Sequence, residues 1–249
     1  LDGVRVLMVV IYNDAGEVVT TCYSRNGKVF ENFTHIEEQV SNNFTKLVRT
    51  IKDRFGSDFT QGFVFDGEVI GNTFQELMRQ ARRKENVQAE DSVFNVFDII
   101  PLQDFRRGYW NAQLHKRIMI LEGMRPIIDA MPNVELLPHI MVDLDTAAGR
   151  DQLDRYAKDQ VNAGFEGIMI KDTNAPYECK RNTFWMKWKP TITVDLEVIG
   201  VEEGTGRNIG RLGALVCAGI DDGKEISVNV GSGFSDADRD DYWTNSNSI

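Results

Sequence analysis

The sequence predicts an α+β protein in two parts, a larger mixed region at residues 1–190 and a smaller all-β region at residues 191–249. Helical and extended patterns mix in the first region without strict β-α alternation, which favours mostly antiparallel sheets over a doubly wound parallel sheet. After Pro190, short apolar segments are separated by glycine-rich turns, and no helical pattern follows. About three strands are recognisable there, fewer than the roughly five of a small barrel, so we expect an incomplete β-barrel.

The composition is that of a folded protein inside the cell. Of the 249 residues, 42% are hydrophobic, and no segment has the ~18 apolar residues of a membrane span. The cysteines are far apart and odd in number. This favours a reducing compartment, the nucleus or the cytoplasm (of a host cell if the protein is viral), over a disulfide framework. No Cys/His spacing indicates zinc.

The net charge of −10 argues against a general nucleic-acid binder, because phosphate binding is driven by Lys and Arg. Positive charge nevertheless gathers at residues 79–84 and 180–189. The first cluster is also what the C-terminus of a helix carries to complement its dipole.

The chain opens with a predicted β-hairpin. Residues 4–12 and 17–23 are β-branched and apolar, and the turn-forming residues 13–16 join them. A further turn is expected at residues 24–27, followed by a third short strand.

Helix signals recur along the first region. Thr34 and Glu37 have the spacing of a capping box, and apolar residues repeat on one helical face until Gly56 ends the pattern. A second capping box begins at Thr73. The remaining expected elements are helices at residues 111–122 and 145–164, and strands at residues 62–70, 93–100, 134–142, 167–171, 184–189, 194–202, 213–218 and 225–230.

Asp66 and Glu68 lie on one face of an otherwise apolar expected strand, because side chains alternate along a strand. Two carboxylates are costly to bury without partners. We therefore expect this face to meet a cation or a sugar hydroxyl. The alternative is a hairpin turn at Asp66 and Gly67, with Glu68 in solvent.

Alternation also places Lys187 and Lys189 on one strand face. Like charges repel unless an anion lies between them, so a phosphate is the expected ligand; the alternative is an ordinary amphipathic strand. Glu166, at a strand entrance, is a candidate Mg²⁺ ligand, and Lys171 is a candidate phosphate contact, although this segment alone fits a solvated surface better. Phe97 is a candidate platform for a base, or a core residue.

In chain order, these segments resemble the motif series of the ATP-dependent DNA ligases of bacteriophage and eukaryotic type, which are covalent nucleotidyltransferases. The resemblance implies an adenylation (nucleotidyltransferase) domain at residues 1–190 and the N-terminal part of an OB-fold domain at residues 191–249. The matching segments are Asp2-Gly3-Val4-Arg5 for the end of K-x-D-G-x-R, Ser24-Arg25-Asn26-Gly27 for S-R-x-G, Asp66-Gly67-Glu68 for D-G-E, Phe97-Asp98 for F-D, Glu166 to Lys171 for E-G-x-x-x-K and Lys187-Trp188-Lys189 for K-x-K.

The resemblance implies a reaction in three steps, with ATP and Mg²⁺. A lysine attacks the α-phosphate of ATP and forms lysyl-AMP; the AMP passes to the 5′-phosphate of a nick in duplex DNA; the 3′-hydroxyl then displaces AMP. The residues that the resemblance assigns are Glu68 for the ribose and a metal ion, Phe97 for adenine stacking, Glu166 for a metal ion, Lys171, Lys187 and Lys189 for the AMP phosphate, and Arg5 and Arg25 for the nucleotide or the nick.

The resemblance also implies parts that the printed sequence does not hold. The nucleophilic lysine is expected directly before Leu1, with the first strand of the domain. A basic C-terminal motif of the OB domain and an N-terminal DNA-binding domain are expected in a longer protein. No residue of the chain is therefore a candidate nucleophile. We expect a monomer that acts on nicked duplex DNA and does not associate with a membrane.

Three alternatives remain open from the sequence. An mRNA capping guanylyltransferase carries a W-K-P pattern, which Trp188-Lys189-Pro190 fits, whereas Glu166 and Gly167 fit a ligase better. An RNA ligase is the second enzymatic alternative. A non-catalytic nucleotide-binding or DNA-binding remnant is the alternative from a different class.

Overall fold

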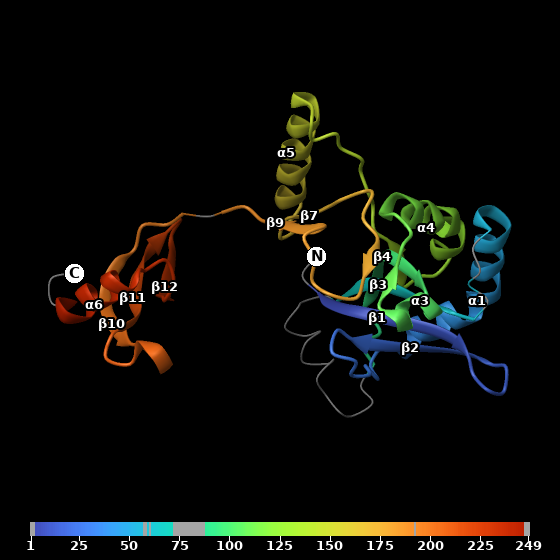
Figure 1. Cartoon of the computed structure of the whole chain (residues 1–249), viewed down its shortest axis with the longest axis horizontal. Helices are drawn as coiled ribbons and strands as arrows, with labels where there is room; N and C mark the ends of the chain where they lie inside the picture. The colour runs from blue at the N-terminus through green and yellow to red at the C-terminus, as the bar shows by residue number, and fades with distance from the viewer. Residues whose placement is uncertain (1–2, 57–58, 60, 72–87, 192, 247–249) are drawn as a thin grey trace. The chain divides into compact units, whose positions relative to one another are not determined.

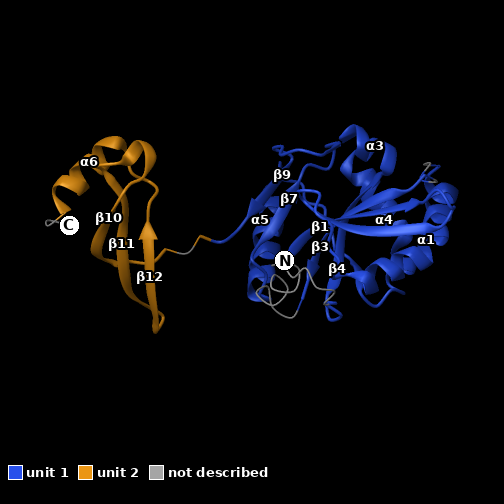
Figure 2. Ribbon diagram, turned by 90° about the horizontal axis from the view of Figure 1, so that it is seen from below, with its two compact units in different colours: residues 1–190 blue, residues 191–249 orange. Residues whose placement is uncertain are grey.

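The computed structural model describes residues 3–56, 59, 61–71, 88–191 and 193–246. The chain divides into two compact units, residues 1–190 and 191–249 (Figure 2). The division falls where the texture of the sequence changes. The helix expected from Thr73 and the basic cluster at residues 79–84 lie outside the described residues.

A five-stranded sheet with the order β2-β1-β3-β4-β6 forms the centre of the first unit (Figure 1). All neighbours are antiparallel except β4 and β6, which are parallel. The prediction of an α+β fold with mostly antiparallel sheets is confirmed. The strands of this sheet are β1 (Val4–Tyr12), β2 (Val18–Ser24), β3 (Phe63–Ile70), β4 (Val93–Pro101) and β6 (Val134–Leu136).

Helices α1 (Thr34–Phe55) and α4 (Leu114–Ile128) lie side by side against this sheet (Figure 1). Their apolar faces and alternate side chains of β1 form the main core, in which Val6 and Met8 are wholly buried. A smaller core, which includes Val64 and Leu102, involves the short helix α3 (Leu102–Arg107). β3 is therefore buried on both faces, which explains its almost continuous apolar sequence.

The capping box expected at Thr34 and Glu37 is wrong. The residue that precedes the helix is Phe33, and no side chain caps it. The Glu37 carboxylate instead accepts a hydrogen bond at 2.6 Å from the backbone N–H of Cys22 on β2. Tertiary packing thus uses the side chain that the local pattern reserved for the helix start. At the other end Gly56 adopts the left-handed conformation as expected.

Other bounds also differ from the sequence patterns. α4 begins and ends later than residues 111–122, and α5 (Ala147–Asn162) is capped by Thr146 and stops short of Gly164. The strand expected at residues 134–142 ends at Leu136; Pro138, soon after, has no N–H to donate to a ladder. After Gly27 only an isolated bridge between Tyr23 and Val29 replaces the expected strand.

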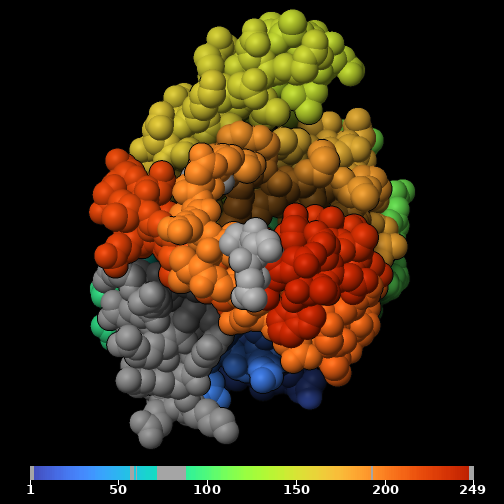
Figure 3. All heavy atoms as spheres, turned by 90° about the vertical axis from the view of Figure 1, so that its left-hand side faces the viewer, coloured from blue at the N-terminus to red at the C-terminus, as the bar shows by residue number. Residues whose placement is uncertain are grey.

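Two short antiparallel ribbons lie beside the sheet. The first pairs β5 (Tyr109–Trp110) with β8 (Tyr177–Glu178), and the second pairs β7 (Ile168–Lys171) with β9 (Trp185–Trp188). Helix α5, which buries only Gly149 and Ala157, projects from the first unit (Figure 3). Among the described residues, no helix has the length and apolar character to cross a membrane.

The second unit contains a three-stranded antiparallel sheet, β10 (Glu197–Glu203), β11 (Leu212–Asp221) and β12 (Lys224–Val230), and a short 3-10 turn (Gly206–Asn208). It also contains helix α6 (Asp236–Thr244), so the expectation that no helix follows Pro190 is wrong. Ser235 and Asp238 form a reciprocal capping box at its start, with bonds of 3.2 and 2.7 Å. Aspartate in place of the usual Glu or Gln at the third position concealed this signal.

Candidate functional site

The ribbon of β7 and β9 presents one face that carries two of the predicted site residues, Lys171 and Lys187. Met169 lies opposite Lys187, and Lys171 lies opposite Trp185. Opposed residues of an antiparallel pair share a face, and so do residues two apart on one strand. Met169, Lys171, Trp185 and Lys187 therefore share a face, which we call the ribbon face.

Glu166 lies between the ammonium groups of Lys187 and Lys189. Lys187 donates to Oε2 of Glu166 at 2.7 Å, and Lys189 donates to Oε1. These hydrogen bonds lower the pKa of Glu166 to about 2. The anion that the paired lysines require is thus supplied within the chain, and both lysines converge on one anionic position.

Gly167 makes this convergence possible. Its φ of +152° is unfavourable for other residues, and a Cβ at this position would overlap the carbonyl oxygen of Trp188. The backbones of the two segments can approach closely only because a hydrogen atom is there. The Glu-Gly pair therefore places the carboxylate of Glu166 next to the lysines of the neighbouring strand.

Lys171 has different surroundings from the other two lysines. Its Nζ lies 4.5 Å from the ring centroid of Phe97 and 4.1 Å from that of Trp185. Burial lowers the pKa of Lys171, while the charges of Asp98 and Asp66 oppose that shift. The ammonium thus lies over aromatic rings, and its contact with a phosphate stays a prediction.

Phe97 owes its position to an irregularity in the sheet. Asp66 pairs with Asp98, but the next residue, Gly67, pairs with Val96, so Phe97 is an extra residue on β4. A bulge of this kind redirects a side chain. Phe97 is half-buried and meets Trp185 edge to face, with ring centroids 5.7 Å apart, so it does not belong to the main core.

Of the two carboxylates expected on one face of β3, Asp66 is the one that is fully buried and therefore requires a partner. Its side chain is 0% exposed, and it accepts hydrogen bonds from Nε and Nη2 of Arg5 at 2.9 and 2.6 Å. The hydroxyl of Tyr177 donates to Oδ2 of Asp66 at 2.7 Å. Arg5 therefore supplies the partner that the burial of Asp66 requires, and the alternative of a hairpin turn at Gly67 is wrong because β3 continues through it.

Glu68 is half-buried at the edge of the same cluster. Its Oε1 accepts a hydrogen bond from the backbone N–H of Gly3 at 2.9 Å. Burial raises the pKa of Glu68; the Gly3 bond and the charge of Lys187 oppose that shift, and the charge of Glu166 adds to it. Glu68 is therefore close enough to the lysine cluster to respond to its charges.

Arg25 lies in the exposed turn that follows β2. Gly27 closes this turn with a hydrogen bond to Ser24 at 2.9 Å. Within the described part of the chain, no hydrogen bond or ion pair joins Arg25 to the other predicted site residues. The structure thus brings Arg25 to the end of the strand next to β1, and its role stays a prediction.

The residues present are suited to Mg²⁺ only when a phosphate also binds it. No group of three or more His, Cys, Asp or Glu side chains among the described residues is arranged as a metal site. Glu68 and Glu166 nevertheless interact electrostatically, and Mg²⁺ is often held by one or two carboxylates together with substrate phosphates. The donor set therefore fits a metal ion shared with a phosphate.

Sequence reasoning assigned no role to four residues of this cluster. Trp185 could have been found, because it lies two residues before Lys187 and so shares its face. Asp98 was noticed only as part of a motif, and its partner Arg117 has no local signal. Tyr177 lies 111 residues from Asp66, to which it donates, so no spacing rule could have connected them.

Comparison with known proteins identifies the family. Residues 1–189 match the family described as "ATP dependent DNA ligase domain". The chain is 28% identical over 230 residues to DNA ligase 2 of Methanosarcina acetivorans, covering 85% of this chain and 39% of that protein. It is 31% identical over 250 residues to the DNA ligase of Halobacterium salinarum, covering 94% and 40%. The chain thus spans about two-fifths of these curated relatives.

A solved structure called "Pmar-Lig_PreS3" is 40% identical, with a TM-score of 0.83 over 100% of this chain and 54% of that one. The ATP-dependent DNA ligase of bacteriophage T7, solved with ATP, is 16% identical with a TM-score of 0.56, covering 92% of this chain and 72% of that one, and shows likeness of fold alone. Because the family match covers residues 1–189 of 249, the chain belongs to the ATP-dependent DNA ligase domain family.

Proposed function

We propose that the full-length protein containing this chain seals 5′-phosphate/3′-hydroxyl nicks in duplex DNA, using ATP and passing through lysyl-AMP and DNA-adenylate. The observation that carries the proposal is the convergence of Lys187 and Lys189 on one anionic position, at 2.7 Å from Lys187. A site that already holds an anion between two ammonium groups needs little reorganisation to hold a phosphate. Family membership supports the same reaction.

Lys187 and Lys189 hold the α-phosphate of the nucleotide in this proposal. The phosphate takes the place that the carboxylate of Glu166 occupies between them. Glu166, no longer between the lysines, would then be able to hold Mg²⁺ together with Glu68. The metal ion would neutralise part of the phosphate charge as that charge builds up during transfer.

Phe97 carries the adenine ring, because its side chain projects from the bulge instead of into the core. Lys171 covers a face of this ring at 4.5 Å. A base that stacks on that face displaces the ammonium, which then becomes available to a phosphate. Glu68 accepts a hydrogen bond from a ribose hydroxyl. Stacking of this kind is worth about 1–3 kcal/mol per base.

The covalent steps follow the resemblance. The lysine expected directly before Leu1 attacks the α-phosphate, its bond to AMP forms, and pyrophosphate leaves. An oxygen of the 5′-phosphate of the nick then takes AMP from the lysine. The 3′-hydroxyl attacks the phosphorus of that 5′-phosphate, the phosphodiester bond forms, and AMP leaves. Arg5 and Arg25 contact the nucleotide or the nick in this proposal, and no side chain of the described site acts as the nucleophile.

We also propose that a DNA-binding domain N-terminal to this chain completes the grip on nicked DNA, that residues 191–249 belong to an OB-fold domain, and that the protein works inside the cell as a monomer. The support for further regions is the length of the relatives, of which the chain covers 39% and 40%. The antiparallel sheet of the second unit is compatible with part of a small barrel.

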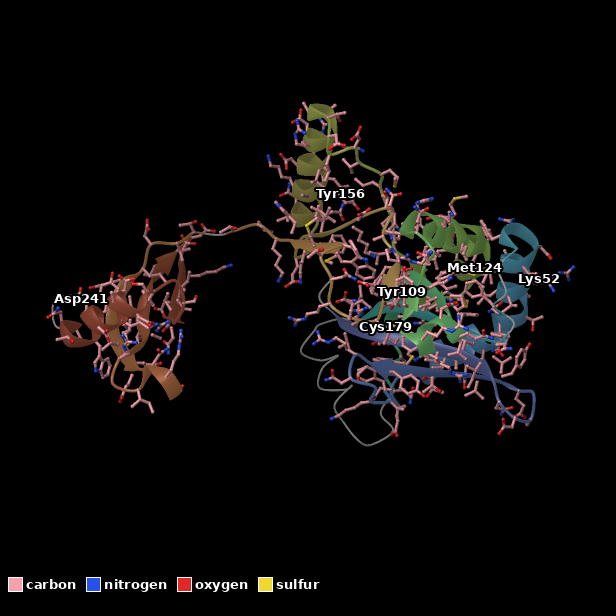
Figure 4. The ribbon with its side chains drawn as sticks, viewed as in Figure 1. Lys52, Tyr109, Met124, Tyr156, Cys179 and Asp241 are labelled. Atoms are coloured by element: carbon pink, nitrogen blue, oxygen red, sulfur yellow. The ribbon has the colours of Figure 1, made fainter. Side chains whose placement is uncertain are left out.

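Incubation of the full-length protein with α-labelled ATP or GTP tests the proposal. ATP, and not GTP, is expected to label the protein, and the labelled protein is expected to seal nicked DNA in preference to nicked RNA. Lys187→Ala should reduce labelling by at least about 100-fold, the typical effect of removing one positioned transition-state donor. The control is Lys52→Ala on α1, which is exposed and labelled in Figure 4. Labelling by GTP, or none by either nucleotide, would contradict the proposal.

A further inference from the structure

Tyr177 joins two ion pairs beside the ribbon face. It lies on β8 and is 3% exposed. Its hydroxyl donates to Oδ2 of Asp66 at 2.7 Å, and Asp66 also binds Arg5. Its ring lies 5.6 Å from the guanidinium carbon of Arg117, which pairs with Asp98. The Tyr177 side chain is therefore fixed on both sides, by its ring and by its hydroxyl.

The hydroxyl shares a single carboxylate oxygen with Arg5. Oδ2 of Asp66 accepts from Nη2 of Arg5 at 2.6 Å and from Tyr177 at 2.7 Å. Burial, and then the charge of Asp66, raise the pKa of Tyr177 far above its ordinary value. The hydroxyl consequently remains protonated and acts as a donor throughout the physiological pH range.

Arg5 depends on this carboxylate for its orientation. Its side chain is 43% exposed, whereas Asp66 is 0% exposed. The two bonds to Asp66 use Nε and Nη2, so the plane of the carboxylate sets the plane of the guanidinium. The guanidinium carbon lies 5.9 Å from the ring centroid of Trp185 on the ribbon face. A rotation of Asp66 would therefore move Arg5 relative to that face.

We propose that Tyr177 is a positioning residue, whose hydroxyl fixes the plane of Asp66 and thereby presents Arg5 to an anionic group of the substrate on the ribbon face. The inference rests on the proposed function, in which that anion is a phosphate of the nucleotide or of the nick. Tyr177 itself touches no reacting atom. Because Tyr177 and Asp66 are 111 residues apart in the sequence, only the tertiary structure brings this hydroxyl to the carboxylate that orients Arg5.

Tyr177→Phe in the full-length protein tests the inference, because it removes only the hydroxyl and leaves Asp66 paired with Arg5. We expect kcat/KM for nick sealing to fall about tenfold, as for loss of one hydrogen bond to a charged group, with most of the loss in kcat. The matched control is Tyr109→Phe on the neighbouring strand β5 (Figure 4), whose hydroxyl donates to Asn111 at 3.0 Å. The control should seal nicks at the wild-type rate.

A second comparison separates positioning from a general structural role. In the Arg5→Lys background, the side chain at position 5 cannot form the two-point contact with Asp66. Tyr177→Phe should therefore cause no further loss of kcat/KM in that background. An equal tenfold loss in the Arg5→Lys background would overturn the inference, since independent effects multiply.

A third measurement does not depend on activity. Exchange of the Nε–H of Arg5 with water, followed by ¹⁵N NMR, should become at least several-fold faster in Tyr177→Phe than in wild type or Tyr109→Phe. Unchanged exchange would overturn the inference even if the wild-type protein seals nicks. If the wild type seals none, the proposed function fails, and the exchange rates still decide whether Tyr177 positions Arg5.

Discussion

The carboxylate of Asp98 and the guanidinium of Arg117 form an ion pair from which solvent is excluded on both sides. Nε of Arg117 lies 2.7 Å from Oδ1 and Nη2 lies 3.0 Å from Oδ2, and both side chains are 0% exposed. Arg117 also donates to the carbonyl of Ala175 at 3.0 Å. Strand β4, helix α4 and the segment before β8 are therefore joined at the residue that directly follows Phe97.

Asp98→Ala should destabilise the first unit by about 3–5 kcal/mol, because it leaves the buried guanidinium of Arg117 without its counter-ion. Urea denaturation followed by far-UV circular dichroism measures the change. The control is Asp53→Ala, which breaks the exposed ion pair with Arg49 and should cost no more than about 0.5 kcal/mol. Equal effects of the two substitutions would show that burial does not decide the strength of the Asp98 pair.

The ionisation of Glu166 should be abnormal and should depend on its two lysines. Because its pKa is lowered to about 2 on folding, the ion pairs are fully formed above the ordinary Glu value of about 4.3. Their contribution to stability is lost as the pH falls through about 2. The carboxyl ¹³C shift of Glu166 followed between pH 1.5 and 7 measures the midpoint.

The double variant Lys187→Met/Lys189→Met supplies the control for this titration. With both hydrogen bonds removed, the midpoint of Glu166 should rise to about 4.3. A wild-type midpoint near 4.3 would mean that Lys187 and Lys189 do not form these ion pairs with Glu166 when the protein is in solution.

Gly167→Ala should separate Glu166 from Lys187, because the new Cβ would overlap the carbonyl oxygen of Trp188. We expect the pKa of Glu166 to move towards its ordinary value and the thermal midpoint to fall. Gly164→Ala is the matched control: Gly164 also has a positive φ, of +89°, but a Cβ there meets nothing within 4 Å. It should cost only the backbone strain of about 1 kcal/mol and leave the Glu166 titration unchanged. The same titration shift in both variants would contradict this account.

Lys171→Met should not lower stability, and should raise it at pH 7. The pKa of Lys171 is lowered by burial on folding, so its charged form opposes folding at every pH below that value. This destabilisation disappears above about pH 10.4, where the Lys171 side chain is neutral in the unfolded chain as well. The wild type should therefore gain stability relative to the variant between pH 7 and 10.5.

Lys171→Met should nevertheless weaken ATP-dependent labelling of the full-length protein, because the proposed function assigns Lys171 to the AMP phosphate. Comparison of urea midpoints with labelling rates measures both effects. A stable variant with undiminished labelling would remove Lys171 from the nucleotide site.

Local patterns predicted much of this fold because hydrophobic periodicity acts over a few residues. The hairpin of β1 and β2, the apolar face of α1 and the glycine at its end followed from spacing alone. The capping box at Thr34 failed because Glu37 hydrogen-bonds to Cys22 across the core. Such competition between a local and a distant partner is decided by packing.

Parts of the candidate site were predictable for the same reason. Strand alternation placed Lys187 and Lys189 on one face, and their mutual repulsion indicated an anion. That the anion here is Glu166, brought close by Gly167, required the pairing of β7 with β9. Likewise, the position of Phe97 depends on a one-residue bulge that no spacing rule reveals.

By itself, the sequence determined the α+β class, the change of texture near Pro190 and the set of charged side chains suited to a nucleotide, because all of these depend on neighbouring residues. Only the tertiary structure decided which charges meet. Tyr177 and Asp66 are 111 residues apart, and Arg117 finds Asp98 across 19. A buried charge must take whichever partner the folded chain brings within hydrogen-bonding distance, and burial then makes that choice costly to change.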